Sequence, residues 1–262
     1  MNELGMKIGT QTWLGSWLLA VLAFNLVFFL QELFLVLPKS LVPGLNPILF
    51  HNNHDWSGSD PVAELLQGTG ALFILLAGLV ALWRLRRRPG GSATWRLFFA
   101  WFAFNGLFQS LPQLVIGAFV PANDVARALI WLGFGESGRL AAALLAILVM
   151  IWAGRALVPV FRAFAPALRP VPLVLRLVSL PGLAAIPLIW LFRVPGGAAQ
   201  VALVPVIMIV SGLIFVSLGA LWPRGIAPGP RGGAVSWLPP ALAMAVLLAF
   251  FQLVLRPGIA FF

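Results

Sequence analysis

Long apolar stretches, separated by short segments rich in proline, glycine and polar residues, set the pattern of this chain. A helix needs about 20 mostly apolar residues to cross a bilayer. We therefore predict an all-α, polytopic integral membrane helical bundle, formed as one transmembrane domain over residues 1–262. About seven segments are long enough, with approximate bounds 13–37, 62–83, 96–119, 140–159, 172–192, 199–222 and 236–255.

The composition excludes a soluble enzyme and a disordered chain. Hydrophobic residues make up 61% of the sequence, charged residues only 9%, and the mean hydropathy is +1.01. Soluble domains are about 45–50% apolar and about 25% charged. The chain has no cysteine and no tyrosine, which excludes disulfides, thiolate chemistry and cysteine-based zinc or iron–sulfur sites.

The distribution of basic residues predicts the orientation. Lys and Arg collect in short cytoplasmic loops of membrane proteins. With a cytoplasmic N-terminus, five of the basic residues fall on the outer side: Lys39, Arg127, Arg139, Arg193 and Arg256. The other twelve fall on the cytoplasmic side: Lys7, Arg84, Arg86, Arg87, Arg88, Arg96, Arg155, Arg162, Arg169, Arg176, Arg224 and Arg231.

The net charge of +10 therefore reflects membrane topology, and we expect no nucleic-acid partner. Most acidic residues fall on the outer side, and Glu3 is the one assigned to the cytoplasmic side. We expect the cell membrane, in particular a bacterial inner membrane, as the location, with membrane lipids as partners.

The segment 124–138 leaves two possibilities open. Asp124 is a suitable N-cap for a short interfacial helix that leads into the fourth span. Alternatively, the fourth span begins there and is broken at Gly133 and Gly135.

Polar residues inside the spans concentrate in a polar, site-bearing half at 1–140, whereas 141–262 forms an apolar packing half. Polar groups within a membrane are costly, so their positions are informative. Glu32 lies seven residues after Asn25 on one helix face. The third predicted helix carries a stripe of polar residues, Asn105, Gln109 and Gln113. We predict that this stripe and Asn25 line an outward-opening pocket. The alternative for the stripe is hydrogen bonding between helices.

Both histidines of the chain fall in the segment His-Asn-Asn-His-Asp-Trp, at 51–56. On a helical turn, His51, His54 and Asp55 share one side. Imidazole and carboxylate ligands suit a divalent metal such as Zn, Fe or Mn. We predict a metal site at these three residues, with Glu32 as the catalytic base or a further ligand. The alternative is a polar outer loop that forms internal hydrogen bonds or docks a partner.

These residues support two main functions. The first is a metal-dependent membrane enzyme that hydrolyses, or transfers a group to, a lipid or another membrane-embedded substrate. The second is a non-catalytic structural or assembly subunit of a larger membrane complex. A transporter is less favoured, because no charged residue lies in the middle of the membrane and no inverted repeat is visible.

Overall fold

The computed structural model describes residues 8–87, 90–222 and 233–262, and shows a bundle of long helices. Helix α4 (Ala93–Phe119) packs against helices from both halves of the chain, α1, α3, α6 and α9. The helices are α1 (Thr10–Lys39), α2 (Val62–Leu66), α3 (Thr69–Arg87), α5 (Asp124–Trp131), α6 (Glu136–Arg162), α7 (Pro170–Leu173), η1 (Val174–Ser179), α8 (Leu180–Arg193), η2 (Ala199–Leu203), α9 (Val204–Leu221), α10 (Leu238–Phe250) and η3 (Phe251–Leu255), where η marks π-helical turns.

Among the described residues, six helical stretches are long and apolar enough to cross a membrane. A seventh is obtained when α4 and α5, which are bent by 64° relative to each other, count as one span. The predicted all-α bundle is therefore confirmed, while its orientation in a membrane stays a prediction. Some residues of the orientation argument lie outside the described residues: Glu3, Lys7, Arg88, Arg224 and Arg231.

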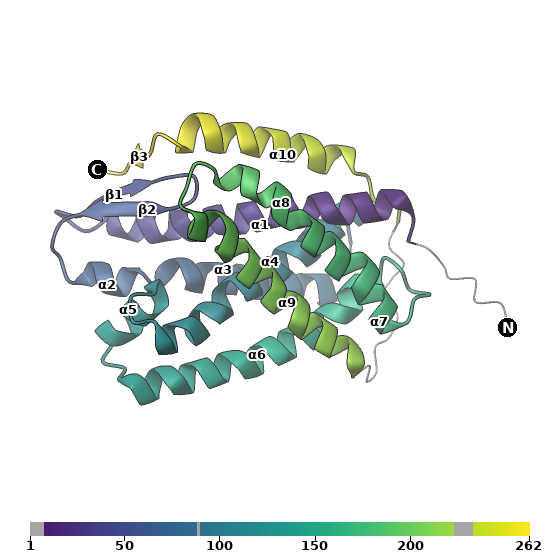
Figure 1. Cartoon of the computed structure of the whole chain (residues 1–262), viewed down its shortest axis with the longest axis horizontal. Coiled ribbons are helices and arrows are strands. Elements are labelled where there is room, and N and C mark those ends of the chain that lie inside the picture. Colours follow the sequence, from purple (N-terminus) through teal and green to yellow (C-terminus); the bar gives the residue numbers. More distant parts are fainter. Residues whose placement is uncertain (1–7, 88–89, 223–232) are drawn as a thin grey trace.

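A small antiparallel sheet, which the sequence pattern did not predict, lies at one end of the bundle (Figure 1). Strands β1 (Asn46–Leu49) and β2 (His54–Ser57) form a hairpin, and β3 (Ile259–Ala260) pairs with β1 from the far end of the chain. We call this end of the bundle, where α1 finishes and α2 and α5 also lie, the hairpin end.

The segment 124–138 contains a short helix followed by a new long helix. The cap of α5 is Asn123, whose side chain accepts a hydrogen bond from the Val125 amide, so the prediction of Asp124 as N-cap is wrong by one residue. Gly133, with φ of +84°, turns the chain before α6 begins at Glu136. A left-handed φ of this kind favours glycine over other residues.

Helix α1 continues past Pro38 to Lys39, although a proline removes one helical hydrogen bond and often ends a helix. The carbonyl of Phe34 is the group that the missing Pro38 amide leaves unpaired. It accepts a hydrogen bond of 2.6 Å from the hydroxyl of Thr69, the first residue of α3. The Thr69 hydroxyl thus replaces the missing backbone donor, so that α1 continues past Pro38 and places Lys39 at the hairpin end.

Glycines allow the long helices to approach closely. A Cβ atom on Gly106 of α4 would lie 2.6 Å from the carbonyl oxygen of Ile74 and 2.8 Å from the Cα of Gly78 on α3. A Cβ atom on Gly154 of α6 would lie 2.1 Å from the carbonyl oxygen of Phe215 on α9. Small residues at such crossings are typical of helices packed within membranes.

Candidate functional site at the hairpin end

Four polar side chains meet at the hairpin end and form what we call the buried quartet: Glu32, Lys39, His54 and Gln67. The two carboxyl-terminal turns of α1 supply Glu32 and Lys39, β2 supplies His54, and the break between α2 and α3 supplies Gln67. The side chains of His54 and Glu32 are 6% and 7% exposed, and Lys39 is fully buried.

Direct hydrogen bonds join the quartet. The Nδ1 of His54 lies 2.7 Å from the Oε2 of Glu32, and its Nε2 lies 3.0 Å from the Oε1 of Gln67. Lys39 Nζ donates to the same Oε1 of Gln67 at 2.8 Å and to the carbonyl of Leu35 at 3.0 Å. The Gln67 oxygen therefore accepts hydrogen bonds from two donors, of which Lys39 is a cation.

These contacts determine the protonation of His54. An ammonium group only donates, so the Gln67 atom that faces Lys39 is the amide oxygen. Because that oxygen also faces His54 Nε2, this nitrogen must carry a proton. The Nδ1 lies 2.7 Å from a carboxyl oxygen of Glu32. The geometry therefore fits an imidazolium at His54, which donates to Glu32 through Nδ1 and to Gln67 through Nε2.

The electrostatic surroundings agree with a charged His54. Burial by itself lowers the pKa of His54, but the hydrogen bond to Glu32 and the charge of this carboxylate outweigh burial. The net result is a pKa above the ordinary value of 6.5.

A ring of further charged and aromatic groups surrounds the quartet. Trp56 stacks on the His54 ring, with 5.8 Å between ring centroids. The Trp56 ring also faces two cations, with Lys39 Nζ at 4.8 Å and Arg127 Cζ at 5.1 Å from its centroid. Such cation–π contacts favour positive charge at this position. Arg127 forms a two-pronged ion pair with Glu64, whose side chain is 41% exposed.

Two more ionisable residues interact with the quartet through space. Asp124, in the first turn of α5, interacts electrostatically with Glu32, His54 and Lys39. Arg193, the last residue of α8, is buried, interacts electrostatically with Glu32, and places its guanidinium 4.1 Å from the centroid of Phe28. Glu32 is thus the carboxylate that His54, Lys39 and Arg193 share.

The predicted metal ligands His51, His54 and Asp55 do not converge. The expectation of a helical turn is wrong, because β2 begins at His54 and successive strand residues point to opposite faces. Asp55 is exposed and accepts a hydrogen bond from the Trp56 amide. Over the described parts of the chain, no three His, Asp or Glu side chains form a group suited to a metal ion.

His51 lies in the hairpin turn and faces the connection between α8 and η2. Its neighbour Asn52 donates to the carbonyl of Arg193 at 2.6 Å. The ring of His51 is buried, and neither ring nitrogen has a hydrogen-bond partner among the described residues. The pKa of His51 lies below its ordinary value of 6.5, chiefly because of burial, although the neighbouring backbone of Arg193 and Pro195 acts in the opposite direction.

The amide stripe on α4 packs directly against α1. Gln109 donates to the carbonyl of Phe24, and Gln113 donates to the side chain of Gln31 at 3.0 Å. Asn105 and Asn25 each donate to a carbonyl four residues earlier in their own helix. These side chains are all buried, and Gln109 and Gln113 join the two helices. A role of the four residues in a substrate pocket stays a prediction.

Sequence reasoning missed the part that Lys39, Gln67 and Asp124 take in this site. The predicted first span ended at residue 37 and so left Lys39 outside the helix, and Asp124 was assigned to a cap. The signal for Gln67 was its position beside Gly68, where the predicted second helix has a weak point. Once this helix is broken there, the Gln67 side chain is free to turn toward α1. No known protein family, curated protein or solved structure matches this chain.

The Glu32–His54 pair predicts a pH dependence of stability. Because the folded state raises the pKa of His54, the pair stabilises the fold fully below about pH 6.5. This contribution is lost as the pH rises through the raised value. Unfolding of the purified protein, followed from about pH 6 to pH 9, should show a stability decline that His54→Gln removes. Parallel declines in both proteins would contradict the ion pair.

Proposed function

We propose that this chain is a multi-pass membrane enzyme with an acid–base site on its outer side. Its substrate is a lipid or another membrane-embedded molecule, and its reaction is hydrolysis or group transfer. One observation carries the proposal: a single oxygen, the Oε1 of Gln67, lies within hydrogen-bond distance of both Lys39 Nζ and His54 Nε2. We infer that a substrate oxygen takes the place of this amide oxygen.

The position of the Gln67 oxygen suits a carbonyl or phosphoryl oxygen that gains negative charge during a reaction. Two donors already point at it, and low exposure strengthens their effect. His54 would act as the general acid through its Nε2 proton, and Lys39 would stabilise the negative charge. Glu32 would hold His54 in its charged form through Nδ1, as carboxylates orient histidines in many active sites.

The membrane location supports the substrate class. Charged residues at the depth of membrane helices are costly and mark functional sites by default. The quartet lies where α1 ends and α3 begins. The excess of basic residues assigns the opposite end of the bundle to the cytoplasm, which places the quartet on the outer side. A bacterial inner membrane would then present lipid headgroups to this site.

The lipid composition of membranes that carry the protein tests this function. We would compare complete lipid extracts by untargeted mass spectrometry for the wild type, Glu32→Gln and His54→Gln. Asp55→Asn is the matched control, because it removes a carboxylate from the same strand on the exposed face. The proposal expects lipid products with the wild type and Asp55→Asn that the other two variants lack. Identical lipid profiles in all four would contradict it.

A second candidate is a non-catalytic subunit of a membrane complex, and the exposure of α9 and α10 favours it. In the most apolar 18 residues of Val201–Leu221, only 28% of the residues are buried. In Leu238–Leu255 the buried share is 22%. These faces suit lipid or helices of other subunits. Identical lipid profiles, together with further subunits that copurify at a fixed ratio, would support this function instead.

The divalent metal stays a prediction that this arrangement does not favour. Both ring nitrogens of His54 are engaged with acceptors, so a metal would have to displace Glu32 or Gln67. Mass spectrometry of bound metal, in the purified protein and in a His51→Ala/His54→Ala double variant, distinguishes metal-dependent catalysis from acid–base catalysis by the quartet. The acid–base proposal expects no metal that depends on these histidines.

A further inference from the structure

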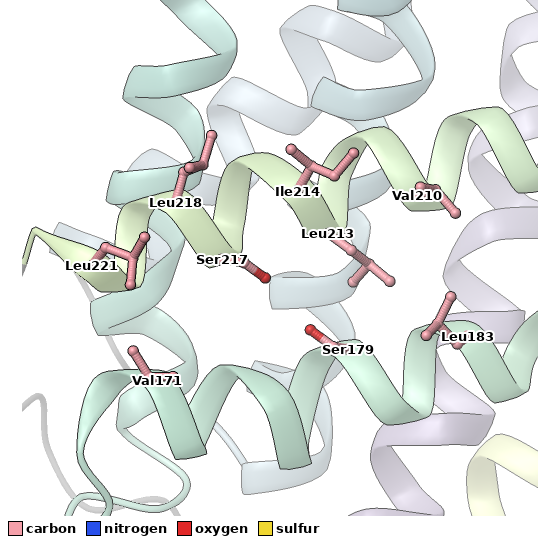
Figure 2. Close-up of a pocket in the computed structure, with 9 residues that line it drawn as sticks. All are labelled: Val171, Ser179, Leu183, Val210, Leu213, Ile214, Ser217, Leu218 and Leu221. Carbon is pink, nitrogen blue, oxygen red and sulfur yellow. The ribbon is translucent and has the colours of Figure 1, made fainter.

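An apolar groove lies far from the quartet, between α9 and the stretch formed by α7, η1 and α8 (Figure 2). Its volume is about 440 Å³, within the range of about 300–1,000 Å³ that ligand sites occupy. Figure 2 shows the hydroxyl oxygens of Ser179 and Ser217 turned into the space between the two helical segments. The remaining lining residues are aliphatic: Val171, Leu183, Val210, Leu213, Ile214, Leu218 and Leu221.

The groove follows the direction of the spans. It extends from Leu183 and Val210, in the interior of their helices, to Val171 and Leu221. Those two residues lie at the end of the bundle opposite the hairpin end, where α7 begins and α9 finishes (Figure 1). A long apolar groove parallel to membrane helices has the shape and polarity to take an acyl chain.

The end of the bundle at which the groove finishes is positively charged. Arg169 precedes Val171, Arg176 lies in η1, and Arg155 lies on α6, where its backbone contacts α9 near Gly219. All three arginines are exposed, and none has a carboxylate partner among the described residues. No Asp or Glu follows Glu136 in the sequence, so this half of the chain supplies no negative charge to balance them.

We propose that this groove binds one acyl chain of an anionic phospholipid, with its phosphate among Arg155, Arg169 and Arg176. The occupant follows from two properties found together. The groove requires a long apolar chain, and the arginines at its end require an anion. A phospholipid with a net negative headgroup satisfies both, and basic sites between membrane helices bind such headgroups.

Competition between two lipids in native mass spectrometry tests the proposal. The purified full chain would receive equal amounts of phosphatidylglycerol and phosphatidylcholine with identical acyl chains. The wild type is expected to retain phosphatidylglycerol preferentially. In the double variant Arg169→Gln/Arg176→Gln, the preference for phosphatidylglycerol over phosphatidylcholine should fall by a factor of about five for each arginine removed. The control Arg256→Gln, an exposed arginine at the hairpin end, should retain the full preference.

A second variant tests the groove itself. Ser217→Phe places a large side chain into the groove and should reduce retention of both lipids. Ala245→Phe, on an exposed position of α10 outside the groove, is the matched control. Equal retention in Ser217→Phe and Ala245→Phe would overturn the groove as the site. A wild type without preference for the anionic headgroup would overturn the role of the arginines. Because the quartet is untouched, these outcomes are independent of the proposed function.

Discussion

Glu32→Gln is expected to destabilise the bundle by about 3 to 5 kcal/mol, the usual effect of removing one partner from a buried ion pair. The substitution keeps the size of the side chain but removes its charge. His54 then loses the counter-ion that it contacts, Arg193 loses its interaction with the same carboxylate, and Lys39 retains Asp124 but loses Glu32. The free energy of unfolding in mixed micelles, titrated with a denaturing detergent, measures this loss.

Glu64→Gln is the matched control for this prediction. It makes the same chemical change to an ion pair at the same end of the bundle, but the side chains of Arg127 and Glu64 are 29% and 41% exposed. Exposed pairs contribute about 0 to 1 kcal/mol, so this variant should remain close to the wild type. Equal losses for the two variants would show that burial of the Glu32–His54 pair has no special importance.

Gly106→Leu is expected to disrupt the packing of α4 against α3. Even the first side-chain atom would lie 2.6 Å from the Ile74 carbonyl oxygen, which belongs to the backbone and cannot turn away. Overpacking of a core costs about 1 to 3 kcal/mol, and occasionally more. We expect a loss at or above the upper value, because two helix backbones must separate. Unfolding measurements and size-exclusion chromatography would detect it.

Gly197→Leu is the control for this substitution, since a Cβ atom at Gly197 would meet nothing within 4 Å. Gly154→Leu offers an independent repeat at the crossing of α6 and α9. Both buried glycines should give large losses, whereas Gly197→Leu should not. If Gly106→Leu were as stable as Gly197→Leu, the close approach of α3 and α4 would be wrong.

The sequence was sufficient for the helices, because a stretch of about 20 apolar residues has few alternatives to a buried or membrane-facing helix. Each predicted span corresponds to an observed helical stretch, with differences of a few residues at the ends. The ends depend on local partners that hydropathy does not register. Ser92, for example, begins α4 by accepting a hydrogen bond from the Trp95 amide.

The hairpin end was much harder to predict, because its conformation depends on contacts between distant segments. Strands β1 and β2 have only four residues each, and β1 also pairs with β3, more than 200 residues later. For the segment 51–56 the sequence pattern therefore indicated a helical turn or a polar loop, and did not predict a strand. The choice between a helical turn and a strand decides whether the side chains of His54 and Asp55 lie on the same face.

The components of the site were visible in the sequence, but their pairing was not. Glu32 and His54 were both singled out, whereas the contacts of Lys39 depend on α1 continuing past Pro38. This continuation rests on the Thr69 hydroxyl, which replaces the missing Pro38 amide as donor to the Phe34 carbonyl, 35 residues away from Thr69 in sequence. A hydrogen bond of this kind has no signature in the pattern of apolar and polar residues.

The protonation of His54 is the most direct test of the buried quartet as an acid–base site. Nitrogen-15 NMR of the histidine rings, in protein reconstituted in lipid at neutral pH, separates imidazolium from neutral imidazole. We expect both ring nitrogens of His54 to carry protons in the wild type, and one of them to lose its proton at lower pH in Glu32→Gln than in the wild type. A neutral His54 ring at neutral pH, or ring signals that shift when zinc is added, would contradict the charged Glu32–His54 pair.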